Sequence, residues 1–110
     1  MVSKSYEEPI ETFNTNSIGT LNILESLKQI KKKCFVIFVT SDKVYKNVEK
    51  VKGYKEDDVL GGKDPYSGSK AAAENIINSF IHSYYNKPSS KILISIARAG
   101  NVIGGGDWSP

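Results

Sequence analysis

The sequence has a single cysteine and lacks any long apolar run. Cys34 has no partner for an intrachain disulfide, which is typical of a reducing compartment, and we expect it to be a small apolar residue at a strand start. No apolar stretch approaches the roughly 18 residues of a membrane-spanning helix. Residues 1–5 do not form the apolar core of a signal peptide. We therefore expect a cytoplasmic protein without a membrane partner.

The sequence also carries little excess charge, with a formal net charge of +3. Much of the excess comes from Lys31–Lys33, which we interpret as complementing a helix dipole. Lys and Arg are too dispersed for a nucleic-acid interface, so we expect no nucleic-acid partner. The balance of 39% apolar and 25% charged residues is that of an ordinary globular protein, in a length that fits one domain at most.

The pattern of apolar residues predicts alternating helices and strands. The predicted order is a helix over 9–30, a strand over 34–39, a long loop over 43–64, a helix over 65–85, a strand over 92–97 and a glycine-rich loop over 100–110. The first predicted strand is an unbroken apolar run, which is typical of parallel sheets covered by helices on both faces, and the second is apolar except for Ser95. A loop as long as the first one is usually functional inside a compact domain.

This order of elements predicts an α/β fold. Helix, strand, helix, strand is a βαβ unit preceded by one helix, as in a doubly wound parallel sheet. Two strands do not complete such a sheet, because each would keep an unpaired edge. We therefore expect the helix-strand-helix-strand portion of a partial Rossmann-like sheet.

Tyr66 and Lys70 are a candidate catalytic pair. They lie four residues apart in the second predicted helix, so both side chains share one face. A nearby ammonium stabilises phenolate, and bringing the pKa of a tyrosine from about 10 to near 7 takes roughly 4 kcal/mol. Such a tyrosine can take a proton from a hydroxyl as hydride leaves the carbon. The alternative is a purely structural pair on a helix.

A second candidate cluster follows the first predicted strand. Thr40, Ser41 and Asp42 lie at its carboxyl end, the edge where open α/β sheets bind ligands. The second helix begins after the next loop and returns to that edge. We expect one crevice that gathers a hydroxyl, a carboxylate, a phenol and two ammonium groups, from Ser41, Asp42, Tyr66, Lys43 and Lys70. The alternative for the first two is a turn or a helix cap.

Four short segments carry a family resemblance. In order they are Asn16–Thr20, Thr40–Tyr45, Tyr66–Lys70 and Arg98–Trp108. This order is similar to that of the extended short-chain dehydrogenase/reductases of the NAD-dependent epimerase/dehydratase family. The sequence Ser-Asp-Lys-Val-Tyr, together with the ending Gly-Asn-Val-Ile-Gly-Gly-Gly-Asp-Trp, resembles the CDP-glucose 4,6-dehydratases in particular. The resemblance covers nearly the whole chain.

The resemblance implies roles in proton transfer at a sugar. Tyr66 would be the base at the C4 hydroxyl, with Lys70 holding the nicotinamide ribose and tuning Tyr66. Ser41 would bond the same hydroxyl, and Asp42 would protonate the departing C6 hydroxyl. Lys43 stands where relatives have a glutamate that removes the C5 proton, and it can act as a base only if its pKa falls well below about 10.4.

The resemblance also implies binding residues. Those for the cofactor NAD would be Thr15, Asn16, Ser41, Tyr66 and Lys70, and those for the substrate would be Ser41, Asp42 and Asn101. Asn16 has helix packing as its alternative role, and we predict no metal site. The implied reaction converts CDP-glucose to its 4-keto-6-deoxy product, with hydride leaving C4 and returning to C6. Full-length relatives are expected to be homo-oligomers.

Two family features are expected to lie outside the chain. The glycine-rich dinucleotide loop would precede residue 1, since Gly104–Gly106 lacks a following helix, and the substrate-binding region would follow residue 110. We therefore expect residues 1–110 to be the central part of a single NAD-binding Rossmann-like domain, inactive by itself. The alternatives are another NAD-dependent sugar-nucleotide dehydratase or epimerase, or a non-catalytic remnant of one.

Overall fold

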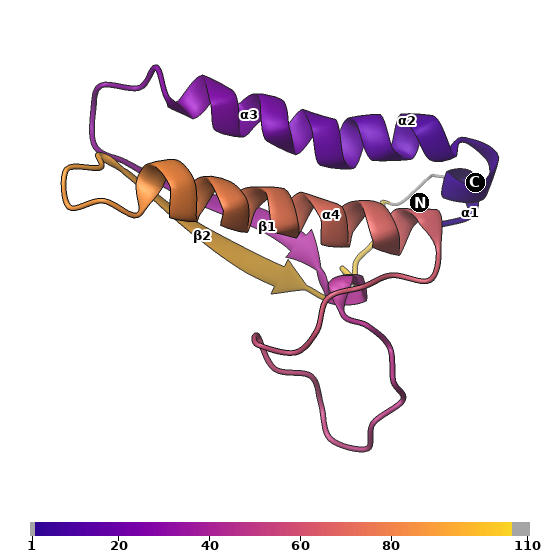
Figure 1. Cartoon of the computed structure of the whole chain (residues 1–110). Helices are drawn as coiled ribbons and strands as arrows, with labels where there is room; N and C mark the ends of the chain where they lie inside the picture. Colours follow the sequence, from indigo (N-terminus) through magenta and orange to yellow (C-terminus); the bar gives the residue numbers. More distant parts are fainter. Residues whose placement is uncertain (1, 107–110) are drawn as a thin grey trace.

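The structure is a computed structural model that describes residues 2–106 (Figure 1). Its elements are α1 (Val2–Glu7), α2 (Pro9–Phe13), a π-helical turn (Asn14–Ile18), α3 (Gly19–Leu27), β1 (Cys34–Ser41), a 3₁₀ turn (Asp42–Val44), α4 (Pro65–Phe80), a second π-helical turn (Ile81–Tyr85) and β2 (Ile92–Ala99). The predicted order of helix, strand, helix and strand is confirmed. The short helix α1 and both π-helical turns were not predicted.

The first long helix runs without interruption from α2 through the π-helical turn into α3 (Figure 1). Pro9 occupies its first turn, which suits proline because a backbone N–H at that position would have no partner inside the helix. The helix ends at Leu27, three residues before the predicted end. The residues around Ile30 form turns instead, closed by hydrogen bonds such as that from the Ile30 N–H to the Leu27 carbonyl.

The two strands form a parallel pair with α4 as the connection between them. Their register runs from Cys34 opposite Ile92 to Ser41 opposite Ala99. Both carboxyl ends therefore reach the same edge of the sheet. The residues that follow each strand, Asp42 and Gly100, leave from this shared edge.

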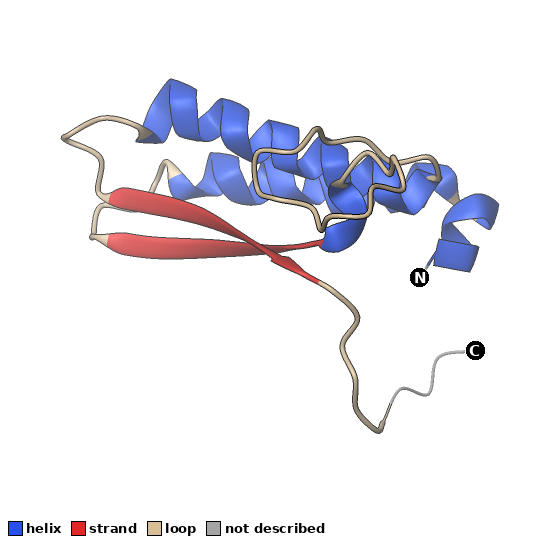
Figure 2. Ribbon diagram, turned by 90° about the horizontal axis from the view of Figure 1, so that it is seen from below, coloured by secondary structure: helices blue, strands red, loops and turns tan. Residues whose placement is uncertain are grey.

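The core lies between this sheet and the helices α3 and α4, which run side by side on one of its faces (Figure 2). Leu24 and Ile77 are almost fully buried there. Burial of side chains of this size stabilises a fold by about 1.5–3 kcal/mol each. Tyr85 closes the far end of the core, and its hydroxyl donates a 2.7 Å hydrogen bond to the Leu24 carbonyl, which satisfies the buried phenol.

The expectation that helices cover both faces of the strands is wrong for this chain. Val36 and Phe38 pack against the core, whereas Phe35, Ile37 and Val39 are exposed, with exposed fractions of 57–66%. The reason is that α3 and α4 both lie on the same face. Among residues 2–106, no helix packs on the opposite face.

The segment between β1 and α4 projects beyond the edge of the sheet (Figure 1). Its base is fastened by hydrogen bonds from the Lys46 N–H to the Val59 carbonyl and from the Gly61 N–H to the Val44 carbonyl, both 2.8 Å. Apart from the 3₁₀ turn at its start, the predicted long loop is confirmed. None of the helices in the described part of the chain has the length and apolarity needed to cross a bilayer.

Candidate active site

The first turn of α4 is fixed by an N-terminal cap. Asp64 precedes the helix, and its carboxylate accepts hydrogen bonds from the Ser67 N–H at 2.9 Å and the Ser67 hydroxyl at 2.6 Å. Partial burial opposes ionisation of this carboxyl, but the hydrogen bonds from Ser67 and from nearby backbone prevail and lower the pKa of Asp64. The cap holds Tyr66 in a rigid turn, between Asp64 and Ser67.

Tyr66 and Lys70 lie on one face of α4, as their spacing predicts. The Lys70 ammonium is 5.9 Å from the centre of the Tyr66 ring, and both side chains are half-buried. They line a hollow of about 220 Å³ together with Thr15 and Asn16 from the π-helical turn of the first long helix. The structure thus brings four of the predicted site residues together, from segments about fifty residues apart.

The π-helical turn is docked onto α4 by hydrogen bonds. The Asn16 amide donates to the Ser69 hydroxyl at 2.9 Å, and the Ser17 hydroxyl donates to the Ser69 carbonyl at 3.0 Å. The Ser69 hydroxyl in turn donates to the Tyr66 carbonyl at 2.7 Å. Asn16 therefore has the helix-packing role that was the alternative to binding NAD. It also lines the hollow beside Tyr66 and Lys70, which we call the Tyr66 hollow. Single π-helical turns are frequent at functional sites.

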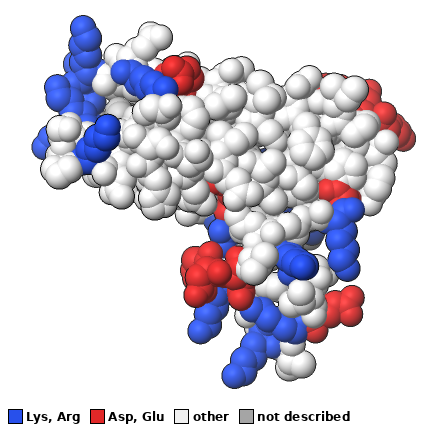
Figure 3. Space-filling view, viewed as in Figure 1, with Lys and Arg blue, Asp and Glu red and all other residues white. Residues whose placement is uncertain are grey.

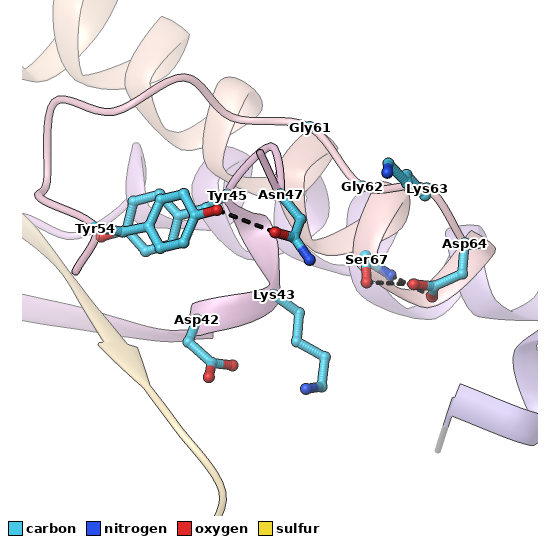
Figure 4. A pocket seen from close by; sticks show the side chains of 10 residues that line it. All are labelled: Asp42, Lys43, Tyr45, Asn47, Tyr54, Gly61, Gly62, Lys63, Asp64 and Ser67. Carbon is cyan, nitrogen blue, oxygen red and sulfur yellow. Dashed lines mark hydrogen bonds between the residues drawn. The ribbon is translucent and has the colours of Figure 1, made fainter. Parts of the chain in front are cut away.

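A second and larger hollow lies on the other side of the first turn of α4 (Figure 4). Its volume is about 560 Å³, and its lining comprises Asp42, Lys43, Tyr45, Asn47, Tyr54, Gly61, Gly62, Lys63, Asp64 and Ser67. Acidic and basic side chains are balanced in this lining. The charged side chains seen in Figure 3 gather over the projecting loop and at the ends of the molecule, and few lie on the face between them.

Ser41 and Asp42 have the turn geometry considered as their alternative role. The Ser41 hydroxyl accepts a hydrogen bond from the Lys43 N–H and donates one to the Asp42 carboxylate, both at 3.2 Å. Ser41 thereby caps the 3₁₀ turn. The Asp42 carboxylate lies near the end of β2, since a Cβ built on Gly100 would be 3.7 Å from its Oδ2 atom. Asn101 follows at this same edge and is exposed.

The single crevice expected from the sequence is therefore divided into two hollows. Tyr66 and Lys70 line one of them, and Asp42 and Lys43 line the other. The division arises because Tyr66 faces the first long helix, whereas its neighbour Ser67 faces the projecting loop. The capped first turn of α4 borders both hollows, with Ser67 lining the larger one and Tyr66 the smaller one. Asp107 and Trp108, part of the last family segment, lie outside the described residues.

Sequence reasoning missed a buried ion pair beside the site. Glu74 on α4 is fully buried, and Arg98 near the end of β2 donates to it from two nitrogens, with a shortest distance of 2.6 Å. The Glu74 side chain raises the pKa of Arg98 above its usual range. Two signals were available. Glu74 interrupts an apolar helix face four residues after Lys70, and Arg98 is the only arginine among 15 basic residues.

Comparisons with known proteins agree with this architecture. The family model described as GDP-mannose 4,6 dehydratase matches residues 1–97. The CDP-glucose 4,6-dehydratase of Salmonella typhimurium is 46% identical to the chain, in an alignment that covers 99% of the chain and 31% of that protein. The chain thus spans about a third of the length of this relative.

Solved structures share the fold. RMD from Pseudomonas aeruginosa, complexed with NADPH, matches with a TM-score of 0.78 and 27% identity over 98% of this chain and 36% of that one. The dTDP-glucose 4,6-dehydratase of Bacillus anthracis, in complex with NAD, matches with a TM-score of 0.64 and 29% identity over 81% of this chain and 27% of that one. The predicted α/β, Rossmann-like fold class is confirmed.

Proposed function

The chain belongs to the family described as GDP-mannose 4,6 dehydratase, and from this premise we propose that it is the central part of a sugar-nucleotide 4,6-dehydratase that acts on CDP-glucose. The observation that carries the proposal is the Tyr66–Lys70 pair, which faces Thr15 and Asn16 across one hollow. The choice of CDP-glucose is supported by the similarity to the Salmonella typhimurium enzyme. Residues 1–110 would then be the middle of a single NAD-binding domain.

We place the nicotinamide end of the cofactor NAD in the Tyr66 hollow, whose lining also includes Lys4, Glu8, Glu11 and Thr12. Lys70 supplies an ammonium, Thr15 a hydroxyl and Tyr66 a phenol, which suit the hydroxyls of a ribose. The volume of about 220 Å³ suits a ribose with its nicotinamide rather than a whole dinucleotide. When bound, NAD would accept hydride from the sugar C4 and return it to C6, so that no cofactor is consumed.

The proposed roles of the side chains follow from their positions. Tyr66 removes the proton of the C4 hydroxyl, with the Lys70 ammonium 5.9 Å from the centre of its ring on the same face of α4. Asp42 is exposed in the neighbouring hollow and protonates the departing C6 hydroxyl. Ser41 can exchange its bond to Asp42 for one to the substrate hydroxyl. Lys43 lines the same hollow as Asp42, and we assign to its amine the proton that leaves C5 as the C6 hydroxyl departs.

An assay of product formation tests this function. The whole protein that contains this chain is incubated with NAD and CDP-glucose, and the 4-keto-6-deoxy product is measured after the reaction is stopped. Parallel reactions with dTDP-glucose and GDP-mannose test the nucleotide preference. We expect turnover of CDP-glucose, and a loss of about 10²- to 10⁴-fold in Tyr66→Phe because a general base is removed.

The matched control is Tyr84→Phe, which removes another phenol at the far end of the same helical segment. This variant should keep the parent rate. Near-normal turnover by Tyr66→Phe would contradict the role of Tyr66. Turnover of the other nucleotide sugars but not of CDP-glucose would contradict the proposed substrate.

A further inference from the structure

Arg98 and Glu74 form a buried, charged junction between the sheet and α4. The Arg98 Nε atom lies 2.9 Å from one Glu74 oxygen, and Nη2 lies 2.6 Å from the other. Thr40 completes the junction, since its hydroxyl donates to the Glu74 carboxylate at 2.5 Å. The register of the two strands brings these side chains together, because Thr40 lies opposite Arg98 in the parallel pair of β1 and β2. The carboxylate of a fully buried side chain is thereby neutralised and hydrogen-bonded.

The remaining nitrogen of Arg98 reaches away from the core to the projecting loop. Its Nη1 atom donates to the Tyr45 hydroxyl and to the Glu56 carbonyl, both at 2.9 Å. The guanidinium also lies 4.7 Å from the centre of the Tyr45 ring. One side chain thus holds β2, α4 and two points of the loop together. A lysine has no planar, five-donor group and could not make all of these contacts, so an arginine suits this position in a chain whose other basic residues are lysines.

The loop held in this way forms one wall of the larger hollow, which Asp42 and Lys43 also line. Tyr45 stacks on Tyr54, with ring centres 5.0 Å apart, and both rings line the hollow (Figure 4). The Tyr54 hydroxyl donates to the Asn47 side chain at 3.1 Å and accepts from the Val48 N–H at 3.0 Å. Tyr45 is therefore the point at which Arg98 contacts a connected aromatic wall.

We propose that Arg98 is a positioning residue. By its hydrogen bond to Tyr45 it holds the projecting loop in place, and so shapes the hollow in which Asp42 meets the sugar nucleotide. We call this contact between Arg98 and Tyr45 the latch. The contact of Arg98 with Glu74 anchors the latch to α4, one helical turn after Lys70. The guanidinium thus links α4, which carries Tyr66 and Lys70, to the loop that lines the larger hollow. The part of this proposal that concerns the sugar nucleotide rests on the proposed function.

Hydrogen–deuterium exchange of the whole protein that contains this chain tests the latch without any assay of activity. Tyr45→Phe removes the hydroxyl that Arg98 contacts but keeps the aromatic ring. We expect exchange of the amides of residues 46–59 to rise roughly threefold or more, with unchanged exchange in β1 and α4. Arg98→Lys should raise exchange both in the loop and at the junction of β1 with α4. Tyr84→Phe is the control and should change neither.

Unchanged loop exchange in Tyr45→Phe, or an equal rise throughout the chain, would overturn the latch. If Arg98→Lys does not fold, Tyr45→Phe still decides the outcome. In the whole protein, Tyr45→Phe should raise KM for CDP-glucose about threefold with little change in kcat, because the latch shapes binding rather than proton transfer. A parent protein without turnover would contradict the proposed function and leave the exchange result standing.

Discussion

The Asp64 carboxylate accepts two hydrogen bonds from Ser67, one from its backbone N–H and one from its hydroxyl, and these bonds fix the turn that carries Tyr66. We predict that Asp64→Ala lowers the free energy of unfolding by about 1 kcal/mol at pH 7, as is usual for loss of an N-terminal cap. The measurement is the midpoint of urea unfolding of the whole protein that contains this chain. Ser79, an exposed residue later in the same helix, provides the control Ser79→Ala.

The stability from the Asp64 cap should depend on pH. The pKa of Asp64 is lowered in the folded chain, so its contribution is complete above the unfolded-state pKa of about 3.9 and is lost as pH falls through the folded-state pKa. Asp64→Asn keeps an acceptor but does not titrate. The parent should therefore exceed this variant in stability at pH 7, and the difference should shrink below about pH 4. A difference that stays constant down to pH 2–3 would contradict the assignment, since that range lies below the usual pKa of aspartate, about 3.9.

Gly62 should not tolerate a side chain. A Cβ at this position would lie 2.3 Å from the Ser67 carbonyl carbon and 2.3 Å from the Gly68 nitrogen, both in the backbone of the capped turn. We predict that Gly62→Ala destabilises the chain by about 2 kcal/mol or more. Gly53→Ala is the control, because a Cβ there meets no atom within 4 Å. Equal unfolding midpoints for the two variants would show that the close approach is relieved without cost.

Asp42→Asn should interrupt the proposed reaction after its first half. Oxidation at C4 depends on Tyr66, whereas loss of water needs an acid at C6, so the whole protein with this change should retain reduced nicotinamide. Absorbance of the reduced nicotinamide after mixing with CDP-glucose is the measurement. Asp57→Asn, at an exposed position of the loop, should behave like the parent. Completion of the reaction at the parent rate would leave Asp42 as a turn residue only.

The chain by itself should bind NAD weakly. A dinucleotide pyrophosphate is held by a glycine-rich turn at a helix N-terminus, but the N-terminus of α4 is occupied by the Asp64 carboxylate, which would repel phosphate. Calorimetric titration with NAD is the measurement, compared with the same chain mixed with the N-terminal segment of an intact relative. Tight binding by the chain alone would mean that a phosphate site exists within it, with Gly104–Gly106 as the first place to examine.

Local patterns in the sequence predicted the elements well. The spacing of apolar residues in two helices and the mainly apolar runs of two strands are short-range signals, and each corresponds to an observed element. The coverage of the sheet could not be predicted in this way. An apolar run such as that around Phe35 shows that a residue type suits burial, but whether a helix covers its face depends on where α3 and α4 pack.

The candidate site was predicted less completely than the fold. The spacing of Tyr66 and Lys70 placed them on one face, because helical geometry alone determines that relation. The division into two hollows depends on which way neighbouring side chains leave α4, and on how a long loop folds back, neither of which follows from spacing. Glu74 and Arg98 meet across the βαβ unit, so each was visible in the sequence only as a charge in an apolar setting.

The in-register pairing of β1 with β2 also determines which changes in length this chain can accept. Side chains alternate between the two faces of a strand, so inserting or deleting one residue between Ile92 and Ala97 would turn Arg98 toward the open face. Glu74 would then keep its charge inside the helix layer with no cation beside it. Exchanges of one apolar residue for another should be common in β2 of natural variants, whereas single-residue insertions and deletions should be confined to the loops on either side.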